Sequence, residues 1–196
     1  MGKKDIEQSP LKPLGIRCIS SDCNNGLHCF KATRKMRVAS ETGHCRYCGI
    51  QLVDWERVHK RDNNDVEYTF DMLKHEFFRH YMWHIDLGQE MIDHALRKGS
   101  LDLIEMCEKR IRTSVGPANP FRDGYQTPRE TSTNVNIIHL AQHATASCCR
   151  TCIEYWHGIP KGRELNSDEI RYLTDLAMLY IKSRLPYLSG EVPTTQ

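Results

Sequence analysis

The sequence predicts a mainly α-helical protein with a zinc-knuckle or ribbon-like module at its N-terminal end. Two observations support this fold class: apolar residues recur at helical spacing after residue 63, and five of the nine cysteines fall between residues 16 and 62. The length of 196 residues suits one domain with a small appendage. No stretch approaches the roughly 20 apolar residues that a membrane helix needs, so we expect no membrane insertion.

Composition divides the chain into four parts. Residues 1–15 and 187–196 are expected to be flexible tails, residues 16–62 a cysteine-rich zinc-binding module, and residues 63–186 a helical domain. The charged N-terminus has no apolar run behind it, which argues against a secretory signal. We therefore expect the reducing cytoplasm, where closely spaced cysteines are more often metal ligands than disulfides.

Helix limits in the second half of the chain follow from capping residues and helix breakers. One helix stops at Gly99, and residues 114–132 form a long polar loop of the kind that is usually functional or mobile. Asn166 or Ser167 caps the last helix, which ends before Pro186. The expected helical ranges are 69–84, 86–98, 100 to the break at Gly116-Pro117, 136–156 and 167–185.

The cysteine-rich segment contains a pattern typical of zinc ligands. Cys45 and Cys48 are separated by two residues, as in a zinc knuckle, and Gly49 relieves the tight backbone that follows. Cys18 and Cys23 form a plausible second pair, and four thiolates complete a closed structural site. Three further side chains can replace members of this set: Cys29 in place of Cys23, and His28 or His44 in place of a thiolate.

A second group of soft ligands occupies residues 141–157. In a helix Cys149 and Cys152 lie on one face, and Cys148 can serve in place of Cys149. A bend near Ser147 would return His143 to the same point as the two cysteines, and His157 follows Cys152 by five positions. A four-ligand shell would be structural, whereas a three-ligand shell would leave a position for an acidified water. The expected ligands are His143, Cys149, Cys152 and His157.

Two runs in this region carry a family resemblance. The segments DGYQTPRE (123–130) and AQHATASCCRTCIEYWHGIPKGREL (141–165), followed by an amphipathic helix, resemble an uncharacterised bacterial family, domain of unknown function 4186. The resemblance covers residues 121–182 and implies kinship and a bacterial or phage setting, but no reaction. The cysteine-rich N-terminal part lies outside it, which implies an added zinc module.

The charge distribution suggests a partner. Residues 1–64 carry 12 lysines and arginines against 7 acidic residues, whereas the remainder carries 15 against 18. Our leading hypothesis is a zinc-binding bacterial or phage protein that contacts nucleic acid through its basic zinc module, because such a surface attracts phosphates. The expected contacts are Arg34, Lys35 and Arg37.

Two competing hypotheses remain open. A metal-dependent hydrolase, such as a nuclease, requires an open coordination position at the second ligand group, with Glu154 or His157 as the proton carrier. An interaction scaffold would use its zinc only structurally and bind a protein partner. We expect two zinc ions, and an iron–sulfur cluster is the competing cofactor because cysteine-rich sites hold both.

Overall fold

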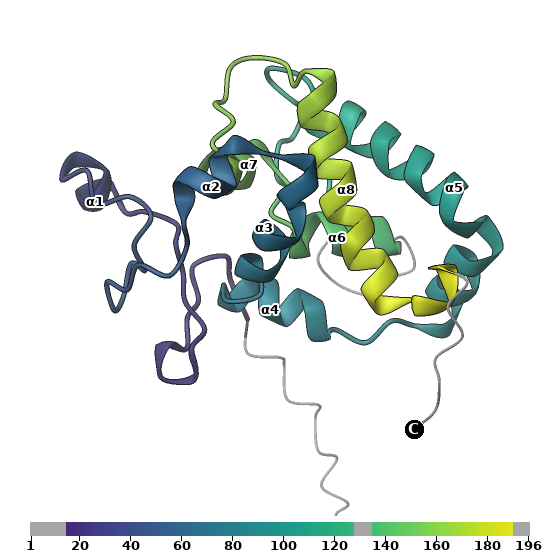
Figure 1. Ribbon diagram of the computed structural model, residues 1–196, viewed down its shortest axis with the longest axis horizontal. Coiled ribbons are helices and arrows are strands. Elements are labelled where there is room, and N and C mark those ends of the chain that lie inside the picture. The colour runs from purple at the N-terminus through teal and green to yellow at the C-terminus, as the bar shows by residue number, and fades with distance from the viewer. Residues whose placement is uncertain (1–14, 128–134, 190–196) are drawn as a thin grey trace, which may run out of the picture.

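The computed structural model describes residues 15–127 and 135–189, and these parts are mainly helical and contain no β-strand (Figure 1). The predicted mainly α class is confirmed. The expected tails at 1–15 and 187–196 lie largely outside the described residues, as does the end of the loop expected at 114–132. The elements are η1 (Cys23–Asn25), α1 (Arg34–Val38), α2 (Trp55–Lys60), η2 (Asn63–Asp65), α3 (Val66–Leu73), α4 (Phe77–His84), α5 (Gln89–Ser114), α6 (Ile137–Ala144), α7 (Arg150–His157), α8 (Ser167–Arg184) and η3 (Pro186–Ser189).

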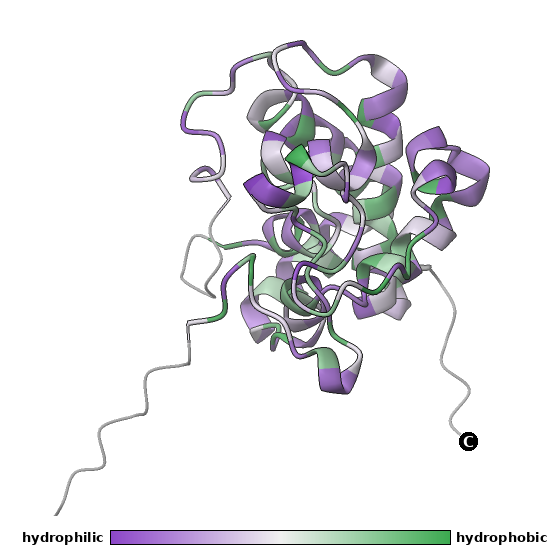
Figure 2. Cartoon of the chain, turned by 90° about the vertical axis from the view of Figure 1, so that its left-hand side faces the viewer, coloured by the Kyte–Doolittle hydropathy of each residue, from purple (hydrophilic) through white to green (hydrophobic). Residues whose placement is uncertain are grey.

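The core is built around α8, which packs against α3, α5 and α6 (Figure 1). The Asn166 side chain accepts a hydrogen bond from the Glu169 N–H, and the Glu169 carboxylate accepts one from the Asn166 N–H, so the predicted cap is present. Figure 2 shows hydrophilic residues along the outer turns of the helices and hydrophobic residues mostly between them. The predicted apolar face of α8 is buried: Ile170, Leu173, Leu176, Ala177, Tyr180 and Ile181.

Gly99 interrupts α5 at the position that the sequence predicts. Its backbone lies at φ 73° and ψ 171°, a conformation that is open mainly to glycine. The long element α5 therefore consists of two helical segments that meet at this residue.

The helix expected over 69–84 is interrupted between α3 and α4. Glu76 has an extended backbone, because the chain pairs here with a distant residue. The His28 N–H donates to the His75 carbonyl at 2.8 Å, and the Phe77 N–H donates to the His28 carbonyl at 2.9 Å. This pairing of residues far apart in the sequence replaces helical hydrogen bonds, so the expectation of one helix was wrong.

A second break separates α6 from α7, where one helix over 136–156 was expected. Ala146 adopts a left-handed backbone with φ 55°, and the Ser147 N–H donates to the Gln142 carbonyl at 2.9 Å, which ends α6. The expected bend near Ser147 is therefore present, but it divides the segment into two short helices. The turn brings Cys148 and Cys149 to the start of α7.

Three aromatic rings join the N-terminal segment to the helical part. The Trp55 ring lies 5.1 Å from the Trp156 ring and 5.8 Å from the Phe30 ring, measured between centroids. Phe30 and Trp156 meet edge to face at 5.9 Å. The Trp55 indole N–H also donates to the Gly43 carbonyl at 2.8 Å. The cysteine-rich segment is thus packed onto α7 through large rings.

Candidate metal centres

Four ligand-type side chains of the N-terminal segment converge, and we call them the first cluster: Cys23, His28, Cys45 and Cys48. Their ligand atoms all lie within 4.8 Å of one another. The Cys23 and Cys45 sulfurs are 3.7 Å apart, and the Cys48 sulfur is 3.5 Å from His28 Nδ1. Tetrahedral zinc, with bonds of about 2.3 Å to sulfur and about 2.0 Å to nitrogen, places two sulfurs roughly 3.8 Å apart and a sulfur and a nitrogen roughly 3.5 Å apart. The first cluster therefore has the residue types and the spacing to hold such an ion.

Two glycine turns bring these ligands together. Gly26 at φ 73° reverses the chain, so that Asp22 and Leu27 pair through hydrogen bonds of 2.7 and 3.0 Å. Gly49 at φ 76° closes the second turn, and its N–H donates to the Cys45 carbonyl at 2.9 Å. Both glycines lie in the left-handed region that side chains disfavour. The first turn carries the chain past Leu27 and places His28 at the cluster.

The backbone around Cys45 favours its thiolate. Burial opposes the charged form, but hydrogen bonds with the backbone of Cys29, Cys48 and Tyr47 outweigh it and lower the pKa of Cys45 to about 6. Metal ions bind the thiolate and not the thiol. Cys45 therefore favours the charged form of the side chain, which is the form that binds a metal cation.

The structure brings together three of the four ligands expected for this site, and it places Cys18 elsewhere. The Cys18 carbonyl accepts a hydrogen bond from the Cys29 thiol at 3.6 Å. His28, which the sequence offers as a replacement for a thiolate, occupies the fourth place. Cys29 and His44, the remaining two replacement ligands, lie outside the cluster, and His44 contacts the Gln51 side chain.

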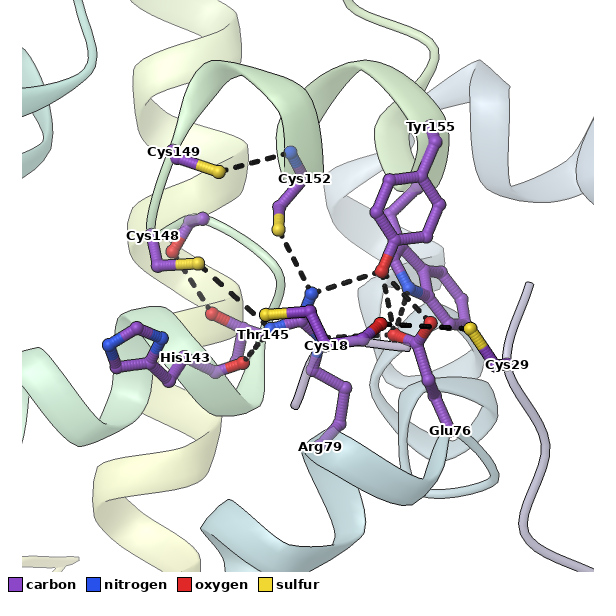
Figure 3. Close-up of polar contacts among 12 residues, drawn as sticks. Cys18, Cys29, Glu76, Arg79, His143, Thr145, Cys148, Cys149, Cys152 and Tyr155 are labelled. Atoms are coloured by element: carbon purple, nitrogen blue, oxygen red, sulfur yellow. Dashed lines mark hydrogen bonds and ion pairs between the residues drawn. The ribbon is translucent and has the colours of Figure 1, made fainter. Parts of the chain in front are cut away.

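Three cysteines of the helical part also converge, and we call them the second cluster: Cys148, Cys149 and Cys152. Their sulfurs lie within 4.8 Å of one another (Figure 3). Cys149 is the N-cap of α7, and its sulfur accepts a hydrogen bond from the Cys152 N–H at 3.4 Å. The turn after α6 adds Cys148, so the second cluster is also able to hold a metal ion.

The histidines expected at this site lie apart from the three sulfurs. Figure 3 shows the His143 ring turned away from them, and its Nε2 lies 3.0 Å from the Thr127 carbonyl oxygen. His157 Nε2 lies 3.0 Å from the Thr145 carbonyl oxygen, and its Nδ1 lies 3.2 Å from the Tyr172 hydroxyl. Both rings are buried and use a nitrogen to bind a backbone carbonyl, because a buried polar atom needs a partner.

Glu154, proposed from the sequence as a proton carrier, is exposed on α7. Its carboxylate accepts a hydrogen bond from the Lys161 N–H at 3.2 Å and lies 3.8 Å from the Lys161 ammonium. The open shell of His143, Cys149 and Cys152 and the proton carrier that the hydrolase hypothesis requires are therefore not gathered at one point.

Arg79 is a site residue that the sequence did not single out. It is fully buried, and its guanidinium donates to the Glu76 carboxylate at 3.0 Å, to the Cys152 sulfur at 3.1 Å and to the Tyr155 hydroxyl at 3.0 Å (Figure 3). Glu76 also accepts hydrogen bonds from Tyr155 at 2.9 Å and from the Trp156 indole at 2.7 Å. The one available signal was an Arg and a Glu three residues apart within an aromatic run.

The charges at the second cluster favour a thiolate at Cys152. Hydrogen bonds with the Cys148 and Cys149 thiols, together with the nearby Arg79 guanidinium, hold the pKa of Cys152 well below its ordinary value. A buried thiolate needs such partners, because desolvation alone would favour the neutral thiol.

Arg34, Lys35 and Arg37, the basic residues expected to contact nucleic acid, form most of α1. All three are exposed. Thr33 caps this short helix, and its hydroxyl accepts a hydrogen bond from the Met36 N–H at 3.2 Å. Figure 1 shows α1 at the outer end of the N-terminal segment, away from α8.

His157 gives the fold a specific dependence on pH. Burial lowers the pKa of His157 to about 3, whereas an unfolded histidine titrates near 6.5. Below pH 6.5 the unfolded chain binds a proton that the folded chain refuses, so stability falls as the pH falls. From pH 6.5 to 5 the loss is about 2 kcal/mol. Urea unfolding of His157→Gln should show a change between these pH values that is smaller by this amount.

The control for this measurement is Leu101→Gln, which alters an exposed side chain on α5 that has no titratable group. It should keep the pH dependence of the wild type. An identical dependence in wild type and His157→Gln would contradict the prediction. Proton uptake by the cysteines contributes equally to the wild type and to each variant, so it cancels when their pH-dependent changes in stability are compared.

Comparison with known proteins places the helical part in a family. The family described as Domain of unknown function (DUF4186) matches residues 67–182, from α3 into α8. This match confirms the resemblance seen over 121–182 and extends it toward the N-terminus; it contains the second cluster and excludes the first. No solved structure matches the chain. Within residues 15–127 and 135–189, none of the helices combines the length and the apolar character required to cross a membrane. Because the match covers more than half of its residues, the chain belongs to the DUF4186 family.

Proposed function

We propose that the first cluster binds zinc and that the loops organised by this zinc contact single-stranded nucleic acid. The observation that carries the proposal is the exposed basic and aromatic surface on a segment with little regular structure of its own. Four protein ligands make the first cluster a closed site of the structural type. The metal would therefore hold the binding surface in shape and take no part in a reaction.

Zinc fits both clusters better than an iron–sulfur cluster does. An iron–sulfur cluster spreads its cysteines over two or four iron atoms, so sulfurs bound to different irons lie further apart than sulfurs that share one ion. The ligand atoms of each cluster lie within 4.8 Å of one another, as a single ion requires. All nine cysteines are free thiols, which suits the reducing cytoplasm of a bacterium or of a cell infected by a phage.

The segment 16–50 offers the two kinds of side chain that single strands need. It carries six lysines and arginines against two acidic residues, which supplies charge for phosphates. Tyr47, between two ligands of the first cluster, has 58% of its surface exposed. Its hydroxyl donates to the Ile19 carbonyl at 2.8 Å, and the Arg46 guanidinium lies 5.5 Å from its ring centre. A fixed, exposed ring beside a cation suits base stacking.

A salt titration tests this function. We expect the triple variant Arg34→Gln/Lys35→Gln/Arg37→Gln to bind a labelled single strand with a weaker salt dependence. The negative slope of log affinity against log salt should become less steep by about 2, because each phosphate contact releases a counterion. Tyr47→Ala should weaken binding to the single strand about tenfold, through lost stacking. Binding would be followed by fluorescence anisotropy, with a duplex of the same sequence for comparison.

The matched control is Arg97→Gln/Lys98→Gln/Lys109→Gln, which removes three positive charges from exposed positions on α5. It should leave the slope within experimental error of the wild type. Equal losses in both triple variants would mean that only net charge matters and would contradict the proposed surface. No binding of the wild type at low salt would reject nucleic-acid contact and favour the interaction scaffold.

A further inference from the structure

The second cluster places three sulfurs where one cation can use them all. Cys148 and Cys152 are buried and Cys149 is partly exposed. A disulfide would join two of the three and leave the third as a thiol. A thiophilic divalent cation would instead bind all three, and the N-cap hydrogen bond at Cys149 holds part of this geometry in place.

Arg79 places one positive charge beside the second cluster. Its guanidinium lies 3.1 Å from the Cys152 sulfur and 4.0 Å from the Cys148 sulfur. The guanidinium also pairs with Glu76, so it cannot neutralise three thiolates by itself. A divalent cation would offset two of the three negative charges that thiolates at this cluster would carry.

A continuous series of direct contacts joins the first cluster to the second. At the first cluster, His28 is a candidate ligand, and its backbone pairs on both sides of Glu76 through hydrogen bonds of 2.8 and 2.9 Å. The Glu76 carboxylate accepts from Arg79 at 3.0 Å, and Arg79 donates to the Cys152 sulfur at 3.1 Å. The three residues of this series, His28, Glu76 and Arg79, are buried. A shift of His28 therefore alters the position of the charge beside Cys152.

We infer that the second cluster is a metal centre for a thiophilic divalent cation and that its affinity is coupled to metal binding at the first cluster. A cation at the first cluster would fix His28, and the series of contacts would then hold Glu76 in place and, through it, the Arg79 guanidinium at the Cys152 sulfur. Coupling between binding sites is reciprocal and typically amounts to about 5–150-fold in affinity. The coupling rests on the metal binding proposed for the first cluster, whereas the second centre does not.

Metal content tests the second centre. Full-length protein should bind two zinc ions, Cys149→Ser/Cys152→Ser one, and Cys45→Ser/Cys48→Ser one. Cys107→Ser, which alters a buried cysteine outside both clusters, should keep two. If the wild type binds one zinc ion and Cys149→Ser/Cys152→Ser also binds one, the second centre is overturned. If the wild type binds one zinc ion and Cys149→Ser/Cys152→Ser binds none, the result supports the second centre and rejects the first. Cobalt substitution would show in each case whether sulfur is bound, through its charge-transfer absorption.

Competition with a chelating indicator tests the coupling. We expect the second cluster to bind zinc about tenfold more weakly in Cys45→Ser/Cys48→Ser than in the wild type. The first cluster should be weakened by the same factor in Cys149→Ser/Cys152→Ser. Unchanged affinities in both variants would overturn the coupling. Glu76→Gln keeps all seven cysteine and histidine ligands but removes the charge between the clusters. Provided that its circular dichroism matches the wild type, the two affinities in this background should become independent.

Discussion

Removal of zinc from the first cluster should unfold residues 16–62 and leave the helices from α3 to α8 in place. Within this segment the regular elements are short: η1, α1 and α2 have three, five and six residues. Such a segment buries too little apolar surface to offset its conformational entropy, so metal binding must supply the difference. Structural zinc contributes about 10–16 kcal/mol in zinc-finger peptides, which is at least as large as the stability of an ordinary domain.

Two signals would report this unfolding. Trp55 packs on Trp156 and donates to the Gly43 carbonyl, so its fluorescence should shift to longer wavelength when a chelator is added. Trypsin should then cut rapidly after the basic residues of α1, while far-ultraviolet circular dichroism falls only slightly. Cys107→Ser should respond to the chelator like the wild type. An unchanged melting curve and unchanged protease resistance after chelation would contradict a zinc-organised segment.

Arg79→Met should lower the free energy of unfolding by about 3–5 kcal/mol. The substitution keeps much of the side-chain volume but removes the guanidinium that binds Glu76, Cys152 and Tyr155. It leaves a buried carboxylate without its cation, which is the costly way to break a buried ion pair. Urea denaturation followed by circular dichroism measures the effect.

Two further variants separate charge from volume. Arg112→Met breaks an exposed pair with Glu108 on α5 and should change stability by less than about 1 kcal/mol. Glu76→Gln/Arg79→Met removes both charges and should be more stable than Arg79→Met alone, because the buried carboxylate that Arg79→Met leaves without its cation is removed as well. If the free energy of unfolding lost in the double variant equals the sum of the losses in the two single variants, the loss is due to packing and not to charge.

Local signals allowed part of the fold to be predicted. Gly99 and Asn166 act through their own backbone and side chain, and the structure has a break at one and a capping box at the other. The break at 74–76 was missed, and the bend expected near Ser147 is a complete break between two helices. The first depends on pairing with His28, which lies far away in sequence, and the second depends on a left-handed alanine that no propensity favours.

The candidate sites show the same division between local and long-range causes. Cys45 and Cys48 lie within one tight turn, so their spacing alone brings them together. The choice of His28 over Cys18 depends on the reversal at Gly26, whose course the cysteine count does not reveal. Arg79 reaches Cys152 across 73 positions, and only the packed helices place them in contact.

The Phe30 and Trp55 rings of the cysteine-rich segment cover the Trp156 ring of the helical part. A fragment restricted to 67–182 would retain Trp156 but lose both rings that cover it. It would also lose His28, the pairing partner of the extended backbone at Glu76. Such a fragment would expose the Trp156 indole and leave the Phe77 N–H and the His75 carbonyl without their His28 partners, so it should self-associate. Protein prepared for crystallisation or binding studies should therefore begin ahead of the first cysteine.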